Sequence, residues 1–180
     1  MRIANLIFAF LIAVPASWPA AASDAKSAIT APKIDVCFTP GDQCADQLIA
    51  RIDAAQTAIR VQAYSFTAID IADALIRARK RGLDVVVVVD KSQTRERYSM
   101  IDELKNEGVP VFIDDCCAIA HNKVMIIDER IVVTGSYNFT KAAELRNAEN
   151  MLIIDDSALA ARYLANWQKH RGGSKDYVTH

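Results

Sequence analysis

The sequence predicts an α/β domain built on a mixed, largely buried β-sheet. Stretches with apolar residues at helical spacing alternate along the chain with stretches rich in β-branched residues, which is the pattern of strands connected by helices. The run LDVVVVVD, residues 83–90, is almost continuously apolar, as expected of a strand buried on both faces. A chain of 180 residues, 52% of them hydrophobic, is large enough for one domain with a substantial core.

The predicted elements follow one another as strand and helix in near-regular alternation. Strands are expected at residues 34–38, 58–66, 83–90, 109–114, 123–128, 130–136 and 150–155. Helices are expected at residues 45–56, 68–82 and 95–108, in a segment that starts with FTKAAELRN at residue 139, and at residues 157–170. A tight turn at residues 128–130 joins two of the strands, and Ser157 is the expected N-cap of the last helix.

The N-terminus has the three parts of a secretory signal peptide. Arg2 supplies the positive charge, residues 3–14 form a short apolar stretch, and PAAAS at residues 19–23 supplies small residues for cleavage near Ala22 or Ser23. The expected organisation is a signal peptide at 1–22, a flexible lead-in at 23–33 and one domain at 34–180. This predicts a periplasmic or secreted protein without stable membrane association after cleavage, with an uncleaved membrane anchor as the alternative.

The four cysteines lie beyond this segment, and export would permit disulfides. Cys37 and Cys44 flank the turn-rich loop FTPGDQ, which favours a bridge between them. Cys116 and Cys117 are adjacent and could form a vicinal bridge, pair between chains or stay reduced. The cysteines lack zinc-site spacing, so the sequence predicts no metal site.

The charge of the chain does not single out a partner. The net charge is −1, whereas nucleic-acid-binding proteins are often basic. The basic stretches RARKRG at 77–82 and NWQKHRGGSK at 166–175 are most simply solvated helix ends. A nucleic-acid substrate would therefore have to be recognised by local features.

The stretch HNKVMIIDERIVVTGSYNFT, residues 121–140, concentrates groups that suit a phosphate. His121 and Lys123 are two residues apart on a predicted strand, so their side chains share one face. Ser136 and Asn138 are also two apart, and they are expected to end the next strand and to open a helix whose free N–H groups favour anions. The arrangement predicts a site where lysine provides charge, asparagine donates hydrogen bonds and histidine attacks or transfers a proton.

Each residue taken alone has a structural explanation. Asp128 suits the turn, Ser136 and Asn138 suit helix capping, and Gly135 suits a close backbone approach. The combined spacing H-x-K-x4-D-x6-G-S-x-N fixes six positions at once, which favours a functional site over six unrelated structural roles.

This spacing resembles the HKD motif of the phospholipase D superfamily, and all six positions match. The continuation NFTKAAELRNAEN and the earlier segments CFTPGDQC and VQAYSFTAIDIADALIRARKRGLDVVVVVD resemble the small bacterial endonucleases of that superfamily. The resemblance covers residues 34–170. It implies a phospholipase D-like mixed sheet flanked by helices in a single domain.

The resemblance also implies a role for each site residue. His121 would be the nucleophile that forms a phosphohistidine, and Lys123 and Asn138 would bind the non-bridging phosphate oxygens. Ser136 would hydrogen-bond near the same oxygens. Glu149 would accept a hydrogen bond from the other imidazole nitrogen of His121. Asp128, the aspartate of the motif, would hold the loops in place.

The number of motifs predicts the assembly. The implied mechanism needs one histidine to attack and a second to protonate the leaving oxygen, but the chain has only one motif. His170 and His180 are expected to be surface residues. The prediction is therefore a two-fold homodimer in which each chain supplies His121. No cofactor is expected, and the adjacent Asp114 and Asp115 should point to opposite sheet faces, which does not suit a metal pair.

The leading functional hypothesis is a metal-independent, non-specific endonuclease that hydrolyses DNA, with RNA left open. The first alternative is a phospholipase D or cardiolipin hydrolase that uses the same site. The second is a non-catalytic phosphate-binding envelope protein, which would not need His121.

Overall fold

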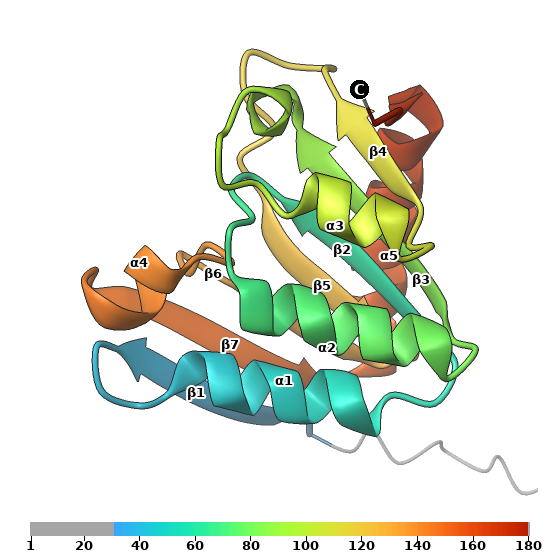
Figure 1. Cartoon of the computed structure of the whole chain (residues 1–180). Coiled ribbons are helices and arrows are strands. Elements are labelled where there is room, and N and C mark those ends of the chain that lie inside the picture. The colour runs from blue at the N-terminus through green and yellow to red at the C-terminus, as the bar shows by residue number, and fades with distance from the viewer. Residues whose placement is uncertain (1–30, 180) are drawn as a thin grey trace, which may run out of the picture. The chain divides into compact units, whose positions relative to one another are not determined.

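The computed structural model describes residues 31–179, which form one eight-stranded mixed sheet in the order β1-β7-β6-β5-β2-β3-β4-β8 (Figure 1). The predicted signal peptide and residues 23–30 of the lead-in lie outside the described residues. The strands are β1 Lys33–Thr39, β2 Ala58–Ala63, β3 Asp84–Asp90, β4 Val111–Asp114, β5 Lys123–Ile127, β6 Ile131–Gly135, β7 Glu149–Asp155 and β8 Lys175–Asp176. Strands β2, β3 and β4 are parallel, and the other neighbouring pairs are antiparallel.

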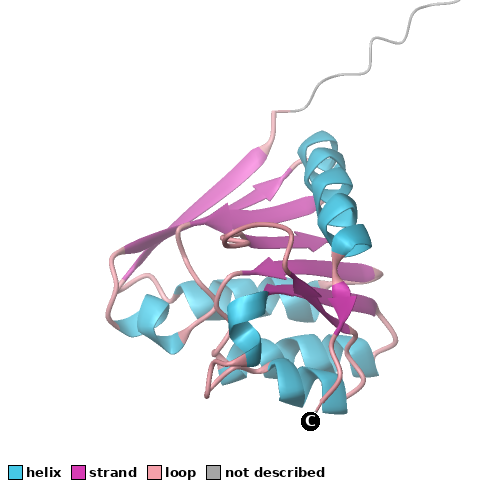
Figure 2. Cartoon of the chain, turned by 90° about the horizontal axis from the view of Figure 1, so that it is seen from above, coloured by secondary structure: helices cyan, strands magenta, loops and turns pink. Residues whose placement is uncertain are grey.

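Helices cover both faces of this sheet. They are α1 Cys44–Ala54, α2 Ile69–Lys80, α3 Ile101–Asn106, α4 Lys141–Leu145 and α5 Ser157–Gly173, with a short 3₁₀ helix at Lys91–Thr94. Figure 2 shows α5 on one side of the sheet and the other helices on the opposite side. The α/β fold class with a mixed sheet, predicted from the sequence, is confirmed.

The sheet separates two hydrophobic clusters, so its central strands are buried on both faces. In β5, Met125 and Ile127 pack in the larger cluster beside α1 and α2, whereas Val124 and Ile126 pack in the smaller cluster beneath α5. Trp167 anchors α5 there, because its indole nitrogen donates a 2.9 Å hydrogen bond to the backbone carbonyl of Val61. This two-sided burial accounts for the uninterrupted apolar runs in the sequence.

The helix predicted at residues 95–108 is wrong in its first half, since α3 begins only at Ile101. The preceding segment makes long-range hydrogen bonds in place of helical ones. The backbone N–H of Met100 donates to the carbonyl of Phe66 at 3.0 Å, and the side chain of Gln93 accepts from the N–H of Phe66 and from the hydroxyl of Ser99. These bonds attach the segment to the chain just after β2, which the local sequence pattern does not reveal.

Two further local expectations are corrected. Ser157 is not the N-cap of α5, because the carboxylate of Asp156 accepts hydrogen bonds from the N–H groups of Ala158 and Leu159. The short strand β8, which pairs with β4, was not predicted. It contains only two residues, too few to show an alternating pattern.

The cysteines behave in two different ways. Cys37 and Cys44 form a disulfide, as predicted, which closes the loop between β1 and α1. Cys116 and Cys117 form no disulfide within residues 31–179 and are exposed, so the vicinal bridge is absent, and pairing between chains stays an untested alternative.

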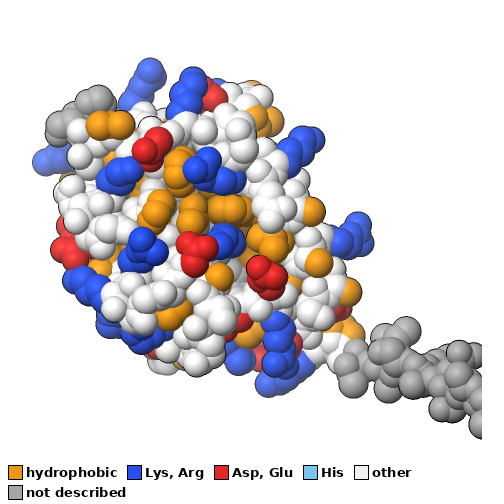
Figure 3. Space-filling view, turned by 90° about the vertical axis from the view of Figure 1, so that its right-hand side faces the viewer, with side chains coloured by type: hydrophobic (Ala, Val, Ile, Leu, Met, Phe, Trp, Pro, Cys, Tyr) orange, Lys and Arg blue, Asp and Glu red, His pale blue; other side chains and the backbone are white. Residues whose placement is uncertain are grey.

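Within residues 31–179, none of the helices is long and apolar enough to cross a membrane. The face shown in Figure 3 carries hydrophobic side chains near its centre, with Lys and Arg interspersed among Asp and Glu.

Candidate active site

The order of the strands brings the predicted site residues to one end of the sheet. Lys123 at the start of β5 pairs with Ala63 at the end of β2, and Gly135 at the end of β6 pairs with Met151 near the start of β7. Residues 121–123, 135–138 and 149 therefore meet although they come from separate segments. Together they line an open hollow of about 370 Å³, formed by His121, Lys123, Gly135, Ser136, Asn138 and Glu149.

His121 and Lys123 share the predicted face but differ in exposure. The imidazole of His121 is exposed at the mouth of the hollow, whereas Lys123 is buried, with 8% of its surface accessible. Burial lowers the pKa of Lys123, and the nearby Glu149 carboxylate opposes this shift. The ammonium donates a hydrogen bond of 3.1 Å to the carbonyl of His121. A poorly hydrated cation held at the base of a polar hollow is well placed to bind an anion.

Tyr64, at the end of β2, is a site residue that the sequence analysis missed. Its ring centroid lies 4.5 Å from that of His121, and the ammonium of Lys123 lies 5.0 Å from the same ring. The ring thus supports the imidazole and interacts with the cation through its π face. The only sequence signal was an aromatic residue within the strand predicted at residues 58–66, which is common in a hydrophobic core.

Replacing Tyr64 with leucine is expected to lower kcat/KM for a phosphodiester about 10-fold, because a cation–π interaction of roughly 1.4 kcal/mol corresponds to that factor. Tyr64→Phe keeps the ring and is the matched control, so it should retain activity. Steady-state kinetics on a small chromogenic phosphodiester measures both variants. An equal loss of kcat/KM in Tyr64→Leu and Tyr64→Phe would show that the hydroxyl of Tyr64, and not its ring, supports the reaction.

Ser136 and Glu149 are joined directly. The hydroxyl of Ser136 donates to a Glu149 carboxylate oxygen at 2.6 Å, and Asn147 donates to the other oxygen at 2.9 Å. The backbone N–H of Asn150 donates to the Ser136 hydroxyl at 3.0 Å. The predicted hydrogen bond from His121 to Glu149 is not among those formed within residues 31–179. Instead, the carboxylate is oriented by Ser136 and Asn147 and faces the same hollow as the imidazole.

Asn138 lies in the loop after β6 and does not open a helix. The helix expected to start at Phe139 begins at Lys141, and the Thr140 hydroxyl caps it by accepting from the N–H of Ala143. The proposed helix N-terminus for anion binding is therefore wrong, since α4 has five residues and its first turn is already capped. The side-chain oxygen of Asn138 is buried without a hydrogen-bond partner. This oxygen only accepts hydrogen bonds, so the amide nitrogen of Asn138 is the atom that can donate to a phosphate oxygen.

Gly135 is required because backbone passes very close to it. A Cβ atom at this position would lie 2.2 Å from the carbonyl oxygen of Asn150, well inside van der Waals contact. That same carbonyl accepts hydrogen bonds from the N–H groups of Ser136 and Tyr137. The glycine thus lets β6 and β7 close together and present Ser136 and Asn138 to the hollow.

Comparison with known proteins agrees with the geometry. The family model "Cardiolipin synthase, PLD-like domain" matches residues 48–171. The chain belongs to the phospholipase D superfamily. Its curated relatives include a protein named phospholipase D from Rickettsia conorii, 42% identical over 148 residues, which cover 82% of this chain and 74% of the relative. A mitochondrial cardiolipin hydrolase from Xenopus tropicalis is 29% identical over 140 residues, covering 76% of this chain and 67% of that protein.

Solved structures of this superfamily share the fold. A phospholipase D family member, Nuc from Salmonella typhimurium, is 40% identical with a TM-score of 0.79, covering 83% of this chain and all of that one. NucT from Helicobacter pylori is 26% identical with a TM-score of 0.75, covering 82% of this chain and all of that one. As a phospholipase D superfamily member, the chain is a phosphodiesterase hydrolase with a single phospholipase D-like domain.

The aspartate of the superfamily motif, Asp128, lies away from the hollow and ties loops together. Its carboxylate accepts hydrogen bonds from the N–H groups of Gln56, Thr57 and Ala58 and from the Thr57 hydroxyl. Its backbone is left-handed, with a φ of 53°, in the predicted tight turn between β5 and β6. The structure therefore gives this residue the loop-holding position that the sequence led us to expect.

Asp128→Asn is expected to destabilise the fold by about 1.5–3 kcal/mol, the range for hydrogen bonds to a charged group. Asparagine tolerates the same left-handed backbone, so the variant isolates the loss of charge. Burial alone would raise the pKa of Asp128, but the hydrogen bonds from Gln56, Thr57 and Ala58 outweigh it and lower the pKa. Because the folded-state pKa lies below the unfolded value, this stability is present above the unfolded pKa and is lost as the pH falls through the folded pKa.

Thermal unfolding of the wild type and Asp128→Asn at neutral pH and at pH 3 measures this effect. The difference in unfolding midpoint between the wild type and Asp128→Asn should be smaller at pH 3 than at neutral pH. The activity per folded molecule should be equal in the two proteins. A variant that unfolds like the wild type but has lost activity would show that Asp128 acts in catalysis.

Proposed function

We propose that this chain is a metal-independent endonuclease that hydrolyses DNA, with RNA as a possible second substrate class, through a phosphohistidine at a homodimer interface. The observation that supports the proposal is the lining of the hollow, in which five residues have polar side chains, the sixth is Gly135, and His121 is exposed. A lipid-cleaving site needs an apolar wall for acyl chains, and none of these six residues provides one. A phosphodiester of a polar polymer fits an open hollow of this kind.

The proposed reaction has two balanced steps. In the first, an imidazole nitrogen of His121 attacks phosphorus and the P–O bond to the leaving oxygen breaks, with that oxygen receiving a proton from a second histidine. In the second, water attacks the phosphohistidine and gives its proton to the second histidine, which releases His121. Lys123 and the amide of Asn138 stabilise the negative charge on the non-bridging oxygens throughout.

The second histidine is proposed to be His121 of another copy of the chain. His170, the other histidine within residues 31–179, is engaged by Asp114 at 2.7 Å and is not in the hollow. The exposed position of His121 leaves it accessible to a second chain. A two-fold axis beside the hollow would then place two imidazoles on opposite sides of one phosphate.

Mixing the wild type with His121→Asn tests the shared site. After the subunits re-equilibrate, activity should fall with the square of the wild-type fraction, since a mixed dimer has only one imidazole. Light scattering should give the mass of a dimer for both proteins. Activity that falls in direct proportion to the wild-type fraction would show that each chain works alone.

A lipid substrate is the second candidate, because the curated relatives are named phospholipase D and cardiolipin hydrolase. Initial rates on plasmid DNA, single-stranded RNA and cardiolipin vesicles, measured side by side with wild type and His121→Asn, separate the two. The proposal expects His121-dependent cleavage of DNA to exceed that of cardiolipin. His121-dependent cleavage of cardiolipin alone would overturn it in favour of a lipase.

Export from the cytoplasm is part of the proposal. The disulfide between Cys37 and Cys44 supports it, because such bonds persist in oxidising compartments. Cell fractionation and N-terminal sequencing should find the chain in the periplasm or medium, starting near Ala22 or Ser23. Recovery of the unprocessed chain in the cytoplasm would contradict this part of the proposal.

A further inference from the structure

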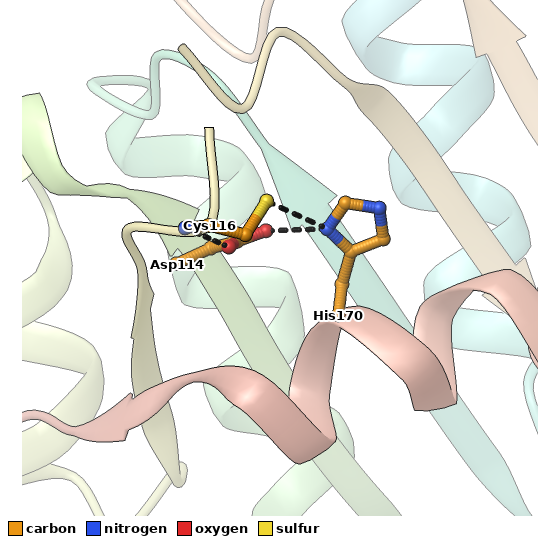
Figure 4. A group of neighbouring side chains, drawn as sticks. All are labelled: Asp114, Cys116 and His170. Atoms are coloured by element: carbon orange, nitrogen blue, oxygen red, sulfur yellow. Dashed lines mark hydrogen bonds and ion pairs between the residues drawn. The ribbon is translucent and has the colours of Figure 1, made fainter. Parts of the chain in front are cut away.

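A second group of reactive side chains lies outside the hollow. Asp114 ends β4, Cys116 lies in the loop that follows, and His170 projects from α5 (Figure 4). The Nδ1 atom of His170 is 2.7 Å from a carboxylate oxygen of Asp114 and 3.6 Å from the sulfur of Cys116. Figure 4 shows the three side chains converging from two elements that are 54 or more residues apart.

The donor atoms of this cluster match a transition-metal site. One atom from each of Asp114, Cys116 and His170 lies within 4.8 Å of the others. In a tetrahedral zinc site, bonds of about 2.0–2.3 Å place the ligand atoms roughly 3.3–3.8 Å apart, as the Cys116 sulfur and His170 Nδ1 already are. His170 Nδ1 and Asp114 are hydrogen-bonded at 2.7 Å and would separate on binding. The sulfur of Cys117 lies 2.6 Å from that of Cys116, so it becomes a fourth donor only after its exposed side chain rotates away. Thiolate and imidazole ligands favour Zn²⁺ over the hard cations Mg²⁺ and Ca²⁺.

The surroundings hold these donors in place. Asp114 is 1% exposed, and its other carboxylate oxygen accepts from the N–H of Cys116 at 3.1 Å, which directs the free oxygen at His170. The carbonyl of Cys117 accepts a hydrogen bond from Lys91 at 2.8 Å. Such outer contacts orient ligands in known metal sites.

The charge of the cluster also favours a cation. A carboxylate oxygen of the buried Asp114, the imidazole of His170 and the thiol of Cys116 face one another here. A divalent cation neutralises the carboxylate and the thiolate together and releases the thiol proton to solvent.

We propose that Asp114, Cys116 and His170, with Cys117 as fourth donor, form a binding site for a divalent transition metal, best matched by Zn²⁺. The proton between His170 Nδ1 and Asp114 moves to Nε2 on binding, which frees the Nδ1 lone pair for the metal. The bound ion fastens α5 to the loop that leads from β4 to His121. The site shares no residue with the catalytic hollow, so it is structural and does not depend on the identity of the substrate.

Cobalt substitution tests the site directly. Untagged protein expressed from the full-length sequence is prepared without oxygen, with a thiol assay confirming that Cys116 and Cys117 are free while the Cys37–Cys44 disulfide is intact. Titration with Co²⁺ should produce a thiolate-to-cobalt charge-transfer band that saturates at one ion per chain and disappears when Zn²⁺ is added. Cys116→Ser should abolish the band, and His170→Gln should weaken binding at least about 10-fold.

Thermal unfolding provides an independent measurement. A hundredfold excess of Zn²⁺ over its dissociation constant should raise the unfolding midpoint of the wild type by about 5–10 °C and leave that of Cys116→Ser unchanged. Exposed Cys116 tolerates serine, so the variant should fold. No charge-transfer band and no shift in reduced wild type, or an equal band in Cys116→Ser, would overturn the proposal. An unchanged band in Cys117→Ser would overturn the assignment of Cys117 as the fourth donor.

Discussion

His121→Asn is expected to lower phosphodiester hydrolysis by at least about 10⁴-fold, the scale seen when a nucleophile or its base is removed from a catalytic triad. Among the residues that line the hollow, the imidazole of His121 is exposed at its mouth, whereas Lys123 is buried and the Ser136 hydroxyl donates to Glu149. Without the imidazole, the proposed phosphohistidine cannot form. Hydrolysis of a small chromogenic phosphodiester measures the loss without any contribution from polymer binding.

The control for His121→Asn is a measurement of whether the variant folds like the wild type. Because His121 is exposed, asparagine should leave the thermal unfolding midpoint and the mass measured by light scattering unchanged. Activity within 10-fold of the wild type in a correctly folded variant would mean that His121 is not the nucleophile, and the hollow would then have to act through Ser136.

Lys123→Met is expected to lower kcat/KM by about 10²–10³-fold, the range for loss of one group that stabilises transition-state charge. The same change should leave stability equal or higher, because methionine removes a buried charge while filling a similar volume. In Lys123→Met, kcat/KM should therefore fall while the thermal unfolding midpoint does not. Steady-state kinetics and thermal unfolding of this variant measure the two quantities.

The protonation of Lys123 predicts the alkaline limb of the pH profile. Its pKa lies below 10.5, the usual value for lysine, because burial disfavours the ammonium. The charged form binds the phosphate oxygens, so activity should fall as the pH rises through this lowered pKa and should fall less in Lys123→Met.

Lys169→Met is the matched control, since Lys169 is an exposed lysine on α5 outside the hollow. On the small phosphodiester it should be as active as the wild type. A Lys169→Met variant that loses as much activity as Lys123→Met would show that net charge, and not the buried ammonium, supports the reaction.

The sequence was sufficient for the parts of the fold and site that depend on local pattern. The valine-rich run at 83–90 predicted a doubly buried strand, and the spacing of His121 and Lys123 predicted a shared face. Both predictions rest on the two-residue period of a strand. Side chains two residues apart point to the same face, whichever strands lie beside it. The turn at Asp128 was predictable for the same reason, because its geometry is fixed by neighbouring residues.

Long-range contacts explain what the sequence could not predict. Tyr64 supports His121 only because β2 and β5 are neighbours in the sheet. His170 was expected to be a surface residue, yet it is half-buried against Asp114. The reason is that the C-terminal part of α5 lies next to the end of β4. The side chains of Asp114, Cys116 and His170 likewise meet across 54 residues or more, a proximity that spacing along the chain does not reveal.

The central claim is that the His121 site cleaves DNA without a metal ion, and supercoiled plasmid in excess EDTA tests it most directly. EDTA also removes any ion from the cluster of Asp114, Cys116 and His170, so the digestion is run at a temperature where the metal-free chain remains folded. We expect nicking and degradation that persist in EDTA and vanish in His121→Asn. Cleavage that stops in EDTA with a folded dimer, or that continues in His121→Asn, would contradict this account.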